Sequence, residues 1–233
     1  MRVRVTTTAL GLVAATALAL YACSATTSEP KPTAPSSART GTPTDADTAT
    51  GTPLSSAALA ARLLSEQDLG SGYTPKPGNT SSQHNDVTVL GCPELSDLGG
   101  DAATGGSLDF PHRAKKAFTY AGSSTSEVAE ELYSDTPGKL SAGTDRIFDA
   151  MVSCPNYQIL AGSTLSDMHV QETPAPRLGD EQWSQLLTYS TGGNRTVVKQ
   201  TAIRAGTILV ILSGSPALVD AHLSSAVRTA LAR

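Results

Sequence analysis

The chain has 233 residues, of which 39% are hydrophobic and only 4% aromatic, and its formal net charge is -4 at pH 7. Such a composition is typical of a globular protein whose core is built mainly from Leu, Val, Ile and Ala. The basic residues form no stripe or cluster, which excludes a nucleic-acid partner and electrostatic binding to anionic lipid from our expectations.

The N-terminus has the pattern of a secretory signal peptide. Two arginines within the first four residues precede an apolar stretch over residues 9–20, which is too short to span a bilayer. The stretch ends in Leu-Tyr-Ala-Cys at residues 20–23, which resembles the lipobox of bacterial lipoproteins. We therefore predict a signal peptide over residues 1–22 and lipidation of Cys23, which would anchor the chain to the extracytoplasmic face of the cell membrane. An ordinary signal peptide followed by a chance cysteine is the alternative.

Residues 23–53 are expected to form a lipidated, disordered tether. Ser, Thr and Pro supply 18 of the 30 residues over 24–53, and no large apolar residue occurs there. Such a segment cannot bury enough surface to offset the entropy lost on ordering. Its predicted role is to hold the folded domain away from the membrane.

The globular domain is predicted over residues 54–233, and its first part has the pattern of helices and loops. Ser56 can cap a helix whose leucines line one face and which stops at the glycines of residues 70–72. The polar composition of residues 75–88 predicts a loop. A short helix over residues 93–98 and a Gly-rich loop are expected to follow.

The middle of the domain is predicted to contain one strand and two helices. Residues 114–121 have the composition of a strand. Ser124 and Glu127 have the spacing of a capping box, which predicts a helix through Tyr133. A second helix follows a Pro-Gly pair, buries one apolar face and closes at Cys154.

The second half of the domain alternates with the period of strands. Hairpin turns are expected at residues 192–194 and 205–206, and an amphipathic helix begins at Pro216. The predicted strands are 157–161, 165–172, 183–190, 196–204 and 207–212. These elements predict an α+β fold with a central antiparallel sheet of about five to six strands, flanked by N-terminal, middle and C-terminal helices.

The number of cysteines predicts one disulfide. If Cys23 carries lipid, Cys92 and Cys154 remain in an oxidising compartment and can pair only with each other. The bond would close a loop of about 62 residues, which is worth roughly 4 kcal/mol in the chain-entropy model. Two free thiols or a metal-binding pair are the alternatives.

No catalytic motif is recognisable, and the histidines are scattered, so we predict no enzymatic activity, no cofactor and no metal site. Asp180 and Glu181, together with Arg204, are the candidate ligand-binding residues. The alternative is that Asp180 bonds local backbone amides in a turn before a strand.

Several short motifs occur in an order that resembles a known family. The motifs are a Leu-rich helix, Asp68-Leu69-x-x-Gly72-Tyr73, Cys92, Cys154 at a helix end, Leu178-Gly179-Asp180-Glu181 and Ile203-Arg204-Ala205-Gly206. Over residues 57–232 the chain resembles actinobacterial lipoproteins whose outer domain is similar to the extracellular sensor domain of the mycobacterial kinase PknH. The resemblance implies an α+β fold and a cleft for an unidentified ligand. The sensor domain of that kinase carries two disulfides, whereas this chain has cysteines for one.

The sequence thus predicts a non-enzymatic, lipid-anchored ligand-binding or sensor-like module at the cell envelope. Its expected ligand is an unknown small molecule or cell-wall component. The sequence contains no kinase domain, so any signalling would need a separate protein. The alternatives are a carrier or chaperone for a lipid or glycolipid, which needs an apolar cavity, and a hydrolase whose site combines Asp180, Glu181 and a histidine.

Overall fold

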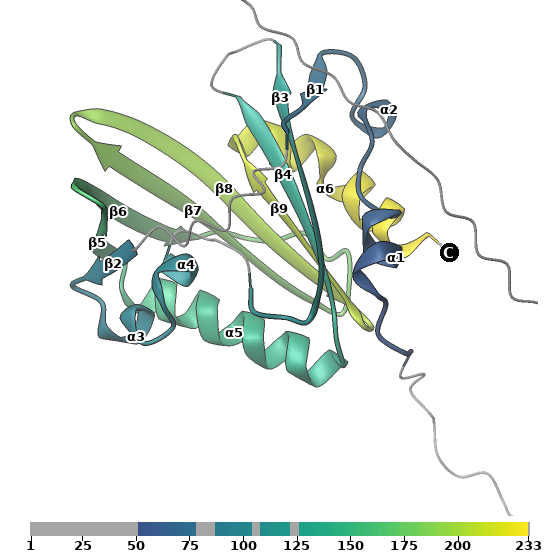
Figure 1. The fold of residues 1–233 in the computed structure, drawn as a ribbon, viewed down its shortest axis with the longest axis horizontal. Coiled ribbons are helices and arrows are strands. Elements are labelled where there is room, and N and C mark those ends of the chain that lie inside the picture. Colours follow the sequence, from purple (N-terminus) through teal and green to yellow (C-terminus); the bar gives the residue numbers. More distant parts are fainter. Residues whose placement is uncertain (1–50, 78–86, 104–107, 122–125, 233) are drawn as a thin grey trace, which may run out of the picture. The chain divides into compact units, whose positions relative to one another are not determined.

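The computed structural model has an α+β fold (Figure 1), which confirms the predicted fold class. It describes residues 51–77, 87–103, 108–121 and 126–232. The predicted signal peptide, Cys23 and nearly all of the predicted tether lie outside these residues. The elements in chain order are α1 (Ser56–Ala60), α2 (Glu66–Leu69), β1 (Tyr73–Pro75), β2 (Val87–Leu90), α3 (Pro93–Ser96), α4 (Gly100–Ala103), β3 (His112–Tyr120), β4 (Glu127–Ser134), α5 (Pro137–Ser153), β5 (Asn156–Ala161), β6 (Thr164–Glu172), β7 (Glu181–Thr191), β8 (Asn194–Ala205), β9 (Ile208–Gly214) and α6 (Pro216–Leu231).

The strands form one nine-stranded sheet in the order β1-β3-β4-β9-β8-β7-β6-β5-β2. Every neighbouring pair is antiparallel. The predicted sheet of about five to six strands is therefore too small. Two of the missed strands, β1 and β2, have only three and four residues. They form the two edges of the sheet, and both overlap the residues 75–88 that were predicted as a loop.

The third missed strand is β4, where the sequence predicts a helix. Glu127 to Ser134 pair with β3 on one side and β9 on the other, so both edges of this segment are hydrogen-bonded. Val128 and Leu132 lie on one face of the sheet and Tyr133 on the other, and all three are buried. Their spacing fits a helix as well as a strand, and burial on both faces favours the strand. Ser124, the predicted cap, lies outside the described residues.

The N-terminal helix also differs from the prediction. Ser55, not Ser56, caps α1 and accepts a hydrogen bond from the amide of Ala58. The helix ends at Ala60, and a second short helix, α2, starts behind a capping box of Ser65 and Asp68. The predicted single helix is thus two helices, because the chain turns between them to bury Leu64.

Six strands and two long helices agree with the prediction. The strands β3 and β5 to β9 and the helices α5 and α6 lie where the sequence patterns place them. Gly192, Gly193 and Gly206 have positive φ angles in the predicted hairpin turns, a conformation that glycine adopts without strain. Strand β9, which is continuously apolar, lies in the sheet interior between β4 and β8.

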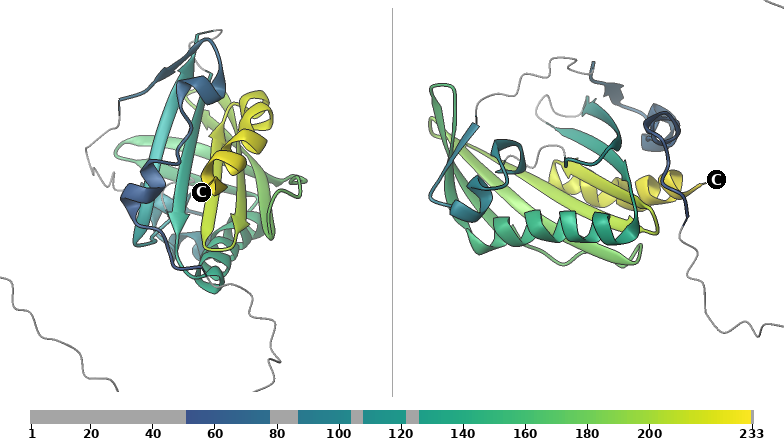
Figure 2. Two further views of the ribbon diagram at one scale, coloured as in Figure 1. Left: turned by 90° about the vertical axis from the view of Figure 1, so that its right-hand side faces the viewer. Right: turned by 60° about the horizontal axis from the view of Figure 1, so that its bottom comes forward.

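The helices cover the two faces of the sheet in separate layers (Figure 2). On one face, α6, α1 and α2 pack over β1, β3, β4, β9 and β8, and we call this the α6 face. On the opposite face, α5 packs with α3 and α4 over the other core, and we call this the α5 face. In the described part of the chain no helix is both long and apolar enough to cross a bilayer.

Candidate functional site

Among the described residues, helices cover only one end of the α6 face. Helix α6 contacts β4, β9 and β8. Its Asp220 pairs with Lys199 of β8 at 2.5 Å, which marks where the cover stops. Beyond this ion pair, the side chains of β7, β6, β5 and β2 on the same face include several that are exposed to solvent. This uncovered region is the part of the sheet available to a ligand.

A hollow of about 400 Å³ lies on the uncovered region, at strands β2, β5, β6 and β7. We define it by six polar side chains that share this face according to the strand register. They are Asn156, Gln158, Asp167, His169, Thr188 and Ser190. The group contains amides, a carboxylate, an imidazole and hydroxyls, so it offers both donors and acceptors of hydrogen bonds.

Cross-strand hydrogen bonds orient four of these side chains. The Gln158 amide donates to the Asp167 carboxylate over 2.7 Å, and Nδ1 of His169 lies 3.0 Å from the Asn156 side-chain oxygen. In the register, Thr188 is opposite His169 and Ser190 is opposite Asp167. The polar groups are therefore arranged before any ligand arrives, which lowers the entropy lost on binding.

Apolar side chains border the hollow. Leu90 of β2, Leu165 of β6 and Val197 of β8 are 41%, 47% and 38% exposed. The register places all three on the same face as the hollow. A polar depression between exposed apolar side chains is typical of a binding surface for a ligand with both polar and apolar parts.

The three residues predicted to bind ligand come together elsewhere, at the start of β7. Nε of Arg204 lies 2.7 Å from the Glu181 carboxylate, and its NH1 atom lies 3.0 Å from Asp180. Asp180 also accepts the backbone amide of Gly206 over 2.8 Å. The two carboxylates therefore already bond to Arg204 and to a turn amide, but that amide belongs to the β8–β9 turn and is not one of the local amides that the alternative interpretation expects. Their role in ligand binding stays a prediction.

The ionisation of this cluster follows from these contacts. The hydrogen bond from Arg204 holds the pKa of Glu181 below its usual value, and contact with Glu181 raises the pKa of Arg204. A hydrolase would need a carboxylate with a raised pKa near a histidine. Glu181 shows the opposite shift.

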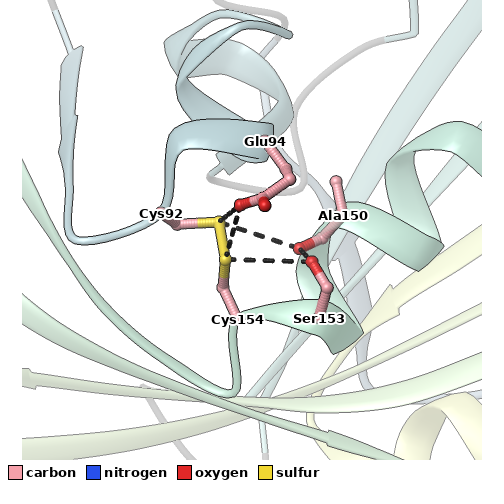
Figure 3. The surroundings of a disulfide bond; sticks show 5 residues. All are labelled: Cys92, Glu94, Ala150, Ser153 and Cys154. Atoms are coloured by element: carbon pink, nitrogen blue, oxygen red, sulfur yellow. Dashed lines mark hydrogen bonds between the residues drawn. A yellow bond between two sulfur atoms is a disulfide. The ribbon is translucent and has the colours of Figure 1, made fainter.

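Cys92 and Cys154 form the predicted disulfide (Figure 3), with their Cα atoms 5.7 Å apart. The bond joins the start of α3 to the end of α5. Glu94 points at the sulfurs, with Oε2 3.4 Å from Sγ of Cys154. These three residues are the one group with metal-ligand spacing found in the described ranges. Both sulfurs are bonded to each other, however, so neither is a thiolate that could bind a metal.

The three histidines in the described ranges do not form a cluster. His169 lies in the hollow, whereas Nε2 of His222 on α6 lies 2.6 Å from the Tyr73 hydroxyl. Burial lowers the pKa of His222, which favours its neutral form beside that hydroxyl. His112 is on β3, and His84 lies outside the described residues.

Two features were missed at the sequence level. The hollow depends on the register of β5, β6 and β7, which the sequence alone does not give. The other feature is Glu130 of β4, whose side chain is only 1% exposed. Burial raises its pKa to about 7. A signal for it was present, since Glu130 and Glu131 interrupt an apolar segment.

Comparisons with known proteins find a similar fold but no close relative. No family model matches the chain, and no curated protein matches it. The crystal structure of the extracellular domain of PknH from Mycobacterium tuberculosis matches with a TM-score of 0.58 and 14% identity, covering 76% of this chain and 97% of that one. The structure of a putative uncharacterized protein from Mycobacterium smegmatis, the Rv0999 ortholog, matches with a TM-score of 0.42 and 13% identity, covering 75% and 97%. The described domain thus has a fold similar to that of the PknH extracellular domain.

Proposed function

We propose that this chain is a non-enzymatic, sensor-like module, anchored outside the cytoplasm by lipid on Cys23, that binds a small molecule or cell-wall component. The hollow on the uncovered sheet is the observation that carries the proposal. It combines six polar side chains, four of them oriented by cross-strand hydrogen bonds, with exposed apolar neighbours. The likeness in fold to an extracellular domain of a kinase supports the location and the sensor-like role. A separate protein would carry the signal onward.

The site chemistry favours binding over the two alternative functions. A lipid carrier needs an enclosed apolar cavity, whereas the hollow is open and its side chains are mainly polar. A hydrolase built on Glu181 needs that carboxylate to hold a proton near neutral pH, whereas its pKa is lowered by Arg204.

Native mass spectrometry tests the ligand site. The lipoprotein, purified from membranes in detergent, is incubated with small-molecule fractions of an envelope extract, and its mass is compared with that of the bare protein. We expect an added mass in the wild type that is lost in the double variant Asp167→Ala, His169→Ala. A control with Glu66→Ala and Lys139→Ala, two exposed residues of α2 and α5, should keep it. An added mass kept by both variants, or absent from the wild type with every fraction, contradicts the proposed site.

Metabolic labelling tests the anchor independently. Cells fed an alkyne-tagged fatty acid should label the wild-type chain and retain it in the membrane fraction. The Cys23→Ala variant should lose both the label and the membrane location. Label that persists in this variant would contradict lipidation at Cys23.

A further inference from the structure

Glu130 is an acid buried between the sheet and the N-terminal helices. It lies on β4 with its side chain on the α6 face, in line with the buried Val128 and Leu132. The register places Lys116 of β3 and Leu212 of β9 on either side of it. Since only 1% of the residue is exposed, water does not solvate this carboxyl group.

The hydrogen bonds of Glu130 leave one oxygen unsatisfied. Oε2 accepts the backbone amide of Leu64 over 2.6 Å. Leu64 lies in the connection between α1 and α2 and is itself fully buried. Oε1 is also buried, and no group in the described part of the chain bonds to it. A carboxylate in this position would have one hydrogen bond in place of the several that water provides, so the neutral acid is favoured.

The charged groups around Glu130 come from β3, the α1–α2 segment and α6. Lys116 reaches over the Phe118 ring, with Nζ 5.0 Å from the ring centre. Asp68 of α2 bonds to Ser65. Arg62 donates to the carbonyl of Ala230 in α6, and Arg228 of α6 donates to the Ser225 hydroxyl. Among the described residues, none of these groups forms an ion pair with Glu130.

The balance of these influences favours the protonated acid. Burial raises the pKa of Glu130 to about 7, and the Leu64 amide offsets part of this effect. The negative charge of Asp68 raises the pKa further, and Lys116 lowers it. The acid therefore changes charge close to neutral pH, while it holds the segment that connects the domain to the tether.

We propose that Glu130 is a proton-controlled latch for the α1–α2 segment. With the proton on Oε1, the neutral acid stays buried and holds Leu64 through Oε2. When the proton leaves, the buried carboxylate is poorly solvated. Lifting of the segment lets water solvate it and lowers its free energy, so opening becomes more frequent. Glu130 lies outside the hollow, and its proposed role needs no ligand.

The segment is well placed to respond. Besides the latch, three buried leucines hold it on the sheet, namely Leu59, Leu64 and Leu69. Ahead of α1, the amide of Leu54 donates to the Ser134 hydroxyl over 2.8 Å. The residues before it are those of the predicted tether, so opening that also breaks the Leu54 bond would lengthen the free chain between the membrane and the domain.

Hydrogen exchange with the full chain tests the latch. Exchange of the amides of residues 56–69 is measured between pH 6 and pH 8.5 and divided by the intrinsic rate at each pH. With a pKa of about 7 when closed and of 4.5 when open, opening should become about tenfold more frequent over this range. Glu130→Gln keeps an acceptor for the Leu64 amide but cannot ionise, so its opening should not change with pH. The exposed acid Glu66 gives a matched control, and Glu66→Gln should behave as the wild type.

Carbon-13 NMR of the Glu130 carboxyl group in the wild type supplies a second measurement that needs no variant. It should titrate near pH 7. Titration below pH 5 would overturn the inference. So would wild-type exchange that does not depend on pH, or a pH dependence that Glu130→Gln retains. If Glu130→Gln does not fold, the carboxyl titration and the wild-type exchange decide the matter together.

Discussion

Arg204 and Glu181 face each other directly across the β7–β8 pair, and Nε of Arg204 lies 2.7 Å from the Glu181 carboxylate. The same guanidinium reaches Asp180 and the carbonyl of Gly206 in the β8–β9 turn. One side chain thus joins the segment before β7 to the turn that starts β9. Glu181 and Asp180 precede Arg204 by 23 and 24 residues in the chain, and the fold brings all three side chains into contact.

Replacing this guanidinium should destabilise the domain. Lysine is a single point charge and cannot bond to both carboxylates at once, so Arg204→Lys should lower the free energy of unfolding by about 2 kcal/mol. Urea unfolding followed by fluorescence of Trp183, the only tryptophan, measures the change. Arg195→Lys at an exposed position should change it by less than about 0.5 kcal/mol. An equal effect of both substitutions would contradict the role of Arg204.

Gly179 should not tolerate a side chain. A Cβ atom there would lie 2.4 Å from the carbonyl oxygen of Arg204 and 2.8 Å from Cγ2 of Ile203. Gly179→Ala should therefore cost about 1–3 kcal/mol of stability, because the backbone of β8 would have to move. Gly138, near the start of α5, has open space around its Cβ position, so Gly138→Ala should be neutral or stabilising. Thermal unfolding compares the two variants, and similar melting temperatures would count against the steric explanation.

Glu130 should make stability depend on pH. Its pKa is raised from 4.5 to about 7 on folding, so the folded state binds the proton more tightly than the unfolded state. Protonation of Glu130 therefore contributes fully to the free energy of unfolding below pH 4.5. This contribution, about 3 kcal/mol, is lost as the pH rises to 7. Glu130→Gln should thus be more stable than the wild type at pH 8 by up to this amount, with the difference vanishing near pH 4. Urea unfolding at several pH values measures the difference in stability. A difference that stays constant from pH 4 to pH 8 would contradict this role of Glu130.

Glu94 should slow reduction of the disulfide. Its carboxylate lies 3.4 Å and 3.9 Å from the two sulfurs and repels an incoming thiolate. Because Glu94 is exposed, the repulsion is modest, and Glu94→Gln should be reduced by dithiothreitol about fivefold faster at low salt. The difference should shrink in 1 M salt, which screens charges. Asp97→Asn is the control, and mass spectrometry after alkylation follows the reaction. Equal rates for wild type and Glu94→Gln would exclude this effect.

The sequence predicts the second half of the fold better than the first for a physical reason. Strand β6 alternates in polarity and β9 is a continuous apolar segment, and glycine turns separate β5 from β6, β7 from β8 and β8 from β9, so these local patterns are enough. In β4 the charged pair Glu130 and Glu131 points into the protein, one on each face, which hides the alternation. Strands β1 and β2 are too short to show a pattern, and only their partners stabilise them.

The candidate sites differ in the same way. Cysteine number, once Cys23 is assigned to lipid outside the cytoplasm, predicts the pair Cys92 and Cys154, and the structure confirms the bond. The sequence groups Arg204 with Asp180 and Glu181 only as candidate ligand-binding residues, and the structure shows that the three form ion pairs with one another. The hollow needs the register of separate strands, for instance His169 opposite Asn156, and no local pattern contains that information.

The positions of β1 and β2 have a consequence for how the protein is made. These strands follow one another in the chain but occupy the two opposite edges of the sheet. Translation proceeds from the N-terminus, so β2 and Cys92 emerge well before β5 and Cys154, and β4 emerges long before β9. The growing polypeptide therefore exposes unpaired strand edges until its last third is synthesised. During that interval the unpaired edges are open to pairing with other nascent chains.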